Sequence, residues 1–183
     1  MKRILGIIIV CCLAGNMCAQ QFQQGELWYE VIGKSQVQVT ADPTDTVYRL
    51  YEQVIVPAKV SYQEHEYCVV RLDDQAFRAC HLMRTIELPE GLKEIGFQVF
   101  MNCTQLAEIR LPNTLRKVDE MAFYGCASME TVYVGKRIKC WPDMCFSDCE
   151  RLKTIYHAGR RPPKSHKMSF FNCPDSVTYC PQR

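Results

Sequence analysis

FMNCTQLAEIRLPNTLRKVDEMA, residues 100–122, is the stretch that decides the fold, because the chain repeats its pattern at a fixed step. Phe77, Phe100, Phe123 and Phe146 are each 23 residues apart, and a cysteine follows each of them three residues later. A fixed step of about 20 to 50 residues is typical of a solenoid, in which successive coils stack on one another. The period therefore predicts one folded body built from stacked coils.

Three registers of this repeat carry an apolar residue at every equivalent position. They are Phe77, Cys80, Met83, Ile86, Leu88, Leu92 and Ile95; Phe100, Cys103, Leu106, Ile109, Leu111, Leu115 and Val118; and Phe123, Cys126, Met129, Val132, Val134, Ile138 and Trp141. These positions are predicted to form the core. Within them, Leu106-x-x-Ile109-x-Leu111 is the pattern of a leucine-rich repeat, which predicts an α/β solenoid with a parallel β-sheet on one face.

Residues 1–19 have the pattern of a secretory signal peptide. Two basic residues precede an uncharged run from Ile4 to Ala14, and the segment ends in Met17-Cys18-Ala19. The run is too short to span about 30 Å of hydrocarbon as a helix, and the alternative is a buried N-terminal helix. Removal of residues 1–19 leaves 20 basic and 20 acidic residues. The overall charge of the remaining chain therefore gives no reason to expect nucleic-acid binding.

The mature chain is predicted to have two parts. Residues 20–53 are predicted to form an N-terminal β-hairpin cap, because β-favouring residues at 27–32 and 36–40 flank Gly33-Lys34-Ser35. Residues 54–183 are predicted to form the solenoid. Its first and last coils depart from the pattern, as expected of terminal repeats that close a core.

Five of the cysteines that remain after the signal segment occupy equivalent sites in successive coils. They are Cys80, Cys103, Cys126, Cys149 and Cys173. We expect them to be free and buried, with thiols that serve backbone carbonyls, although strand spacing also permits disulfides between coils. Four others lie outside this column and their redox state stays open, with one pair close in sequence: Cys68, Cys140, Cys145 and Cys180.

The predicted strands alternate, so the residues between core positions face solvent in two columns. One column is Thr85, Glu108, Thr131 and Thr154, and the other is Glu87, Arg110, Tyr133 and Tyr156. Neighbouring tyrosines beside an arginine are the residue types that dominate interface hot spots. These eight residues are the candidate ligand-binding site, and the alternative is ordinary exposed strand residues chosen for β propensity.

No motif in the chain predicts catalysis, a metal or a cofactor. The histidines lie in no HExxH context, and no phosphate-binding glycine motif occurs. Cys140, Cys145, Cys149 and His157 have zinc-type side chains, but Cys149 belongs to the core column. Residues 136–167 hold nine Lys or Arg against three Asp or Glu, which is either a basic binding edge or a solvated surface.

The chain closely resembles BspA-like leucine-rich repeat surface proteins of anaerobic bacteria. The resemblance lies in VIVPAKVSYQEHEY (residues 54–67), LDDQAFRAC (72–80) and IELPEGL (86–92), with GELWYE (25–30) before them. It implies a curved, right-handed solenoid that is exported and adheres to host or bacterial surface proteins. Asp45-Thr46-Val47 and Asp175-Ser176-Val177 are similar to the O-glycan acceptor pattern of that group.

The resulting functional expectation is a non-enzymatic binding module located at the cell surface, in the periplasm or in the medium. Its partner is expected to be a host or bacterial surface protein, bound through the sheet face. The alternative is a carbohydrate-binding component of a surface system that degrades polymers, with the tyrosines as platforms for sugars. Neither nucleic acid nor a transmembrane segment is expected.

Overall fold

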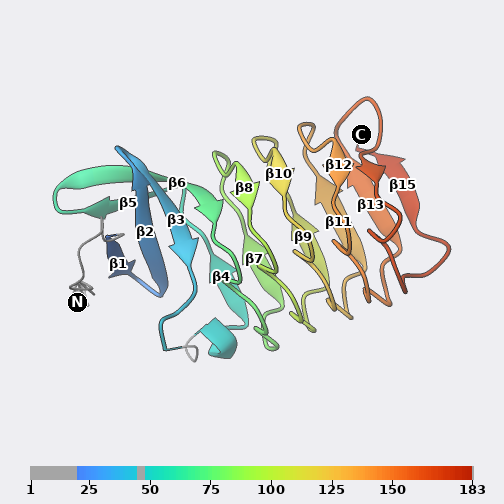
Figure 1. Ribbon diagram of the computed structural model, residues 1–183, viewed down its shortest axis with the longest axis horizontal. Helices are drawn as coiled ribbons and strands as arrows, with labels where there is room; N and C mark the ends of the chain where they lie inside the picture. The colour runs from blue at the N-terminus through green and yellow to red at the C-terminus, as the bar shows by residue number, and fades with distance from the viewer. Residues whose placement is uncertain (1–19, 45–47, 183) are drawn as a thin grey trace.

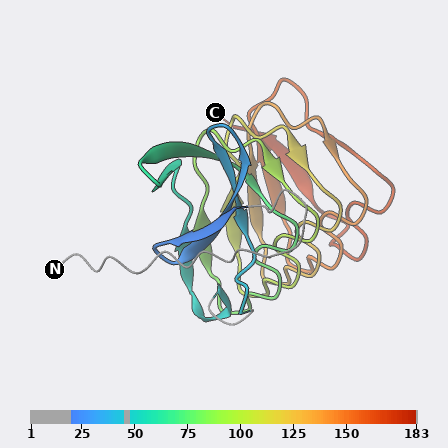
Figure 2. The ribbon, with the colours of Figure 1, turned by 60° about the vertical axis from the view of Figure 1, so that its left-hand side comes forward.

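The computed structural model describes residues 20–44 and 48–182, which form β-coils stacked along the long axis of the molecule (Figure 1). Figure 2 shows the N-terminal strands, in blue, at the near end of this stack and the last coils, in red, at the far end. The predicted signal peptide and Asp45-Thr46-Val47 lie outside the described residues. The solenoid prediction is confirmed.

One sheet contains the N-terminal strands and the strands of the first coils. Its path runs through β1 (Gln21–Gln24), β2 (Leu27–Gly33), β3 (Gln36–Thr40), β6 (His65–Leu72), β8 (Glu94–Ile95) and β10 (Lys117–Val118), while β5 (Lys59–Tyr62) pairs with β6. β1, β2 and β3 pair antiparallel, and β3 then pairs in parallel with β6. A separate hairpin cap is therefore not confirmed, because these strands continue the sheet of the repeats.

Most of the remaining strands form the second side of the coils. The bounds are β9 (Glu108–Arg110), β11 (Thr131–Val134), β13 (Thr154–His157) and β15 (Thr178–Pro181) in one parallel sheet, β4 (Gln53–Ile55) with β7 (Thr85–Glu87), and β12 (Cys140–Trp141) with β14 (Lys164–Ser165). The pair β12–β14 follows β10 on the first side (Figure 1). The coils that contain β7 to β14 thus contribute one strand to each of two sides, and the last described coil contributes β15.

The α/β description is wrong, because the described residues contain only the 3-10 turn η1 (Tyr48–Leu50) and no α-helix. The third side of each coil is made of turns with left-handed residues, such as Gln98 at φ 55° and Asn102 at φ 60°. Left-handed residues interrupt an α-helix. The backbone instead bonds to the next coil, where Phe100 N–H donates to the Ala122 carbonyl at 2.8 Å.

The core runs the length of the stack as a column of phenylalanine rings. Phe77, Phe100, Phe123, Phe146 and Phe170 stack in order, with neighbouring ring centroids 5.8, 5.4, 5.1 and 5.4 Å apart. All the predicted core positions are buried except Leu88, which is partly buried. The core prediction is therefore confirmed.

The cysteine column packs beside these rings and hydrogen-bonds to the coil before it. Four of the five thiols donate to the carbonyl of a phenylalanine in the preceding coil: Cys103 to Phe77 at 3.2 Å, Cys126 to Phe100 at 3.1 Å, Cys149 to Phe123 at 3.2 Å and Cys173 to Phe146 at 2.9 Å. The nine cysteines of the described part are all free. The prediction of buried thiols that serve backbone carbonyls is confirmed for Cys103, Cys126 and Cys149, whereas Cys173 is only partly buried.

Candidate functional site

The candidate site lies on the outer face of the sheet β9–β11–β13–β15. The middle residues of the first three strands, Ile109, Val132 and Ile155, are buried, which turns the residues on either side of them outward. The register places Tyr133 beside both Arg110 and Tyr156. Because the coils repeat in register, side chains at equivalent positions form columns across the sheet.

The two predicted columns are partly assembled in this sheet. Glu108, Thr131 and Thr154 are aligned across β9, β11 and β13. Thr85 and Glu87 instead pair with β4 in a separate two-stranded sheet. A hollow of about 500 Å³ lies between the two sheets and is lined by Thr85, Glu87, Glu108 and Arg110, so the two columns continue across a gap between sheets and their role as one binding face stays a prediction.

Arg110, Tyr133 and Tyr156 form one continuous stack of flat groups. The two tyrosine rings lie 5.0 Å apart at an angle of 13°, a spacing close to the separation of neighbouring strands. The Cζ atom of Arg110 lies 3.7 Å from the centroid of the Tyr133 ring, which is a cation–π arrangement. Glu108 pairs with Arg110 at 2.8 Å and holds the guanidinium in this position.

A hollow of about 700 Å³ opens beside this stack, lined by Arg110, Tyr133, Tyr156, Cys180, Pro181 and Gln182. Cys180 continues the column, since it pairs with Tyr156 in the register of β13 and β15. The sequence prediction missed Cys180 because it lies 24 residues after Tyr156, not 23. The step from Cys149 to Cys173 is also 24 residues long and was the signal that could have located it. The site is thus a stack of three flat groups followed by a small side chain.

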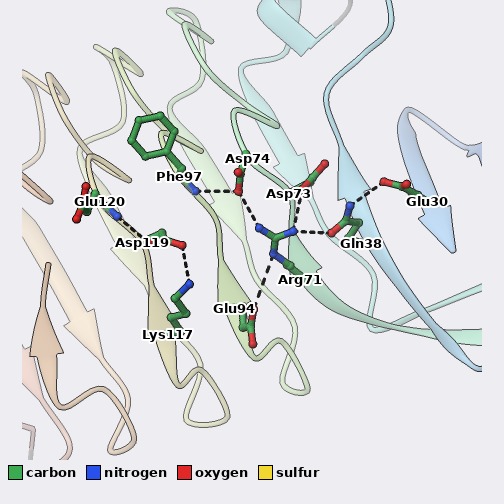
Figure 3. A network of polar contacts seen from close by, with 10 residues as sticks. All are labelled: Glu30, Gln38, Arg71, Asp73, Asp74, Glu94, Phe97, Lys117, Asp119 and Glu120. Carbon is green, nitrogen blue, oxygen red and sulfur yellow. Dashed lines mark hydrogen bonds and ion pairs between the residues drawn. The ribbon is translucent and has the colours of Figure 1, made fainter. Parts of the chain in front are cut away.

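The other sheet carries a different kind of surface, in which charged side chains satisfy one another (Figure 3). Arg71 on β6 contacts Asp73 at 2.9 Å, Asp74 at 2.7 Å and the Gln38 amide oxygen at 2.9 Å. Asp74 also accepts the backbone N–H of Phe97, in the next coil, at 3.1 Å. We interpret this network as a set of contacts that stabilises the packing of the N-terminal strands on the repeats, because its charged groups already have partners within the chain.

The remaining candidates from the sequence do not come together as sites. Within 20–44 and 48–182, no group of three or more His, Cys, Asp or Glu is placed to hold a metal ion, and Cys140 is exposed whereas Cys145 is buried. The basic segment 136–167 is divided between sheets, with Lys153 paired to Glu130 at 2.9 Å and Lys164 on β14. Asp175 and Ser176 are exposed.

The fold and its repeated core define a leucine-rich repeat solenoid. The profile of the BspA type leucine rich repeat region matches residues 70–180 in six copies, and the chain belongs to this family. No curated protein sequence matches the chain. In the part of the chain that is described, no helix has both the length and the apolar character needed to cross a bilayer.

Two solved structures share the fold at low sequence identity. One is a leucine rich cell surface protein from Faecalibacterium prausnitzii A2-165, with 19% identity and a TM-score of 0.60, which covers 91% of this chain. The other is the pneumococcal vaccine antigen PcpA, with 18% identity, a TM-score of 0.56 and 86% of this chain covered. This chain spans 55% of the first protein and 41% of the second.

Proposed function

We propose that this protein is an exported, non-enzymatic binding module that captures a host or bacterial surface protein at the bacterial cell surface. The binding surface is the outer face of β9, β11, β13 and β15. One observation carries the proposal: Arg110, Tyr133 and Tyr156 form a single stack beside a hollow of about 700 Å³. Arginine and tyrosine are enriched among the residues that supply most of the binding energy at protein interfaces.

The rigidity of this stack also favours binding. Each tyrosine has few rotatable bonds, and stacking restricts both rings before a partner arrives, so little conformational entropy is lost on association. The Glu108 pair restrains Arg110 in the same way. By contrast, the polar groups around Arg71 have partners within the chain, which makes that side a poorer candidate. The proposed location is supported by the Faecalibacterium prausnitzii protein of the same fold, which is named a leucine rich cell surface protein.

Replacing both Tyr133 and Tyr156 by alanine is expected to weaken capture of the partner by at least about thirtyfold, since even one hot-spot residue contributes about 2 kcal/mol or more. The partner is first recovered by pulldown from surface-protein extracts of the natural surroundings, and its Kd is then measured with purified components. The melting temperature is expected to stay nearly constant, because both rings lie outside the core. Tyr124→Ala, on the turn side of the coil, is the matched control.

Equal Kd values for the double variant, the control and the wild type would contradict this binding surface. The carbohydrate-binding alternative is tested on a glycan array with the same three proteins. Reproducible glycan signals that depend on the two tyrosines, with no protein partner recovered, would replace the protein-binding proposal.

A further inference from the structure

The column that begins at Arg110 is incomplete at its last position. Three of its members present flat groups, namely a guanidinium and two phenol rings, stacked at the spacing of the strands. The fourth, Cys180 on β15, is aligned with Tyr156 but has a small side chain. The stack of flat groups therefore ends at Tyr156, and the position of Cys180 is where a fourth flat group would lie in register.

One face of the Tyr156 ring is consequently left without a stacking partner. Its other face packs on Tyr133, and no further aromatic or cation–π contact to Tyr156 occurs among residues 20–44 and 48–182. Tyr156 and Cys180 both line the hollow of about 700 Å³, and both are partly exposed. The hollow thus lies over the small side chain and beside the last ring of the stack.

Two of the polar side chains around this position, Arg110 and Gln182, are engaged within the protein. The Arg110 guanidinium is paired with Glu108 at 2.8 Å. The Gln182 amide donates to the backbone carbonyls of Val134 and Tyr156, each at 3.3 Å. A sugar ring needs directional hydrogen bonds for its hydroxyl groups, whereas an aromatic ring needs a flat apolar surface. The surroundings favour the aromatic ring.

We propose that an aromatic side chain of the partner protein enters this hollow, stacks on the free face of Tyr156 above Cys180 and completes the column. This inference rests on the proposed function and names the group that the binding face recognises. The Cys180 thiol adds a sulfur–aromatic contact beneath the ring, a favourable arrangement in proteins. A phenylalanine at position 180 occupies the same space from within the chain and blocks the subsite.

The experiment measures binding of N-acetyl-tryptophanamide by saturation-transfer difference NMR, with N-acetyl-leucinamide and methyl glucoside as comparison ligands. The wild type is expected to transfer saturation to the indole protons and much less to either comparison ligand. Cys180→Phe is expected to raise the Kd of the indole probe roughly tenfold, as loss of a stacked pair does. Cys180→Ser, which keeps the small size but loses the sulfur–aromatic contact, is the matched control and is expected to bind the indole probe more tightly than Cys180→Phe.

The outcomes separate this inference from the proposed function. Absence of indole binding to the wild type, equal affinity for methyl glucoside, or unchanged binding by Cys180→Phe overturns the inference. If Cys180→Phe captures the protein partner normally while the Tyr133/Tyr156 double alanine variant does not, the proposed function stands and the subsite is wrong. If capture survives in every variant, the proposed function itself fails.

Discussion

Raising the pH from about 8 to about 10 is expected to lower the free energy of unfolding by about 2 kcal/mol for each buried thiol that cannot ionise in the folded state. Burial raises the pKa of Cys126 to about 12 and the pKa of Cys145 and Cys149 well above the usual range. In the unfolded chain the same thiols ionise near pH 8.5. Their contribution is therefore fully present below about pH 8.5 and is lost as the pH rises toward the folded pKa.

The measurement is urea unfolding under reducing conditions at several pH values, with Cys126→Ser as the control. A serine hydroxyl can donate to the same Phe100 carbonyl that the thiol serves at 3.1 Å, but it does not titrate in this range. The variant is expected to lose about 2 kcal/mol less stability than the wild type between about pH 8 and about pH 10. The same pH dependence in both proteins would mean that Cys126 already ionises in the folded state.

Replacing Phe100 by alanine is expected to destabilise the protein by about 3 to 5 kcal/mol, the usual loss for a fully buried phenylalanine. The ring is wholly buried between Phe77 and Phe123, with centroid distances of 5.8 and 5.4 Å. Backbone bonds between coils surround it, so the cavity cannot close easily. Urea unfolding monitored by circular dichroism measures the change in the free energy of unfolding.

Phe171→Ala provides the matched control for this substitution. Phe171 is 56% exposed, so the control removes the same kind of side chain from the surface instead of from the core. Its expected loss is below about 1 kcal/mol. If the two variants lost the same stability, the continuous column of rings would not be the main support of the stack.

The core of this fold could be predicted from the sequence because its step does not vary through the middle coils. Equivalent residues in such a stack must occupy equivalent places, so burial of Phe123 and Cys126 followed from the period alone. The turn side could not be predicted in the same way. Its left-handed positions are occupied by residues such as Gln75, Ala79 and Gln98, none of which has the conformational freedom of glycine that would indicate such a turn.

The alignment at the centre of the candidate site could be predicted from the sequence, whereas the pairing of the strands at its two ends could not. Tyr133 and Tyr156 were placed side by side by their common register, which the strand pairing confirms. Whether β7, which carries Glu87, pairs with β4 or with β9 depends on hydrogen bonding between particular strands, which a periodic pattern does not specify. Cys180 was displaced from the expected position by the extra residue in the last coil, so its alignment with Tyr156 became visible only in the sheet.

Thiol labelling with and without the captured partner tests the central claim most directly, because the chain carries its own probes on different surfaces. Cys180 lines the proposed binding hollow, whereas Cys68 and Cys140 are exposed on strands of other sheets. N-ethylmaleimide modification of each cysteine is followed by mass spectrometry. A bound partner is predicted to slow labelling of Cys180 several-fold and to leave Cys68 and Cys140 unchanged. Unchanged labelling of Cys180 together with protection of Cys68 or Cys140 would contradict binding at the Arg110–Tyr133–Tyr156 stack.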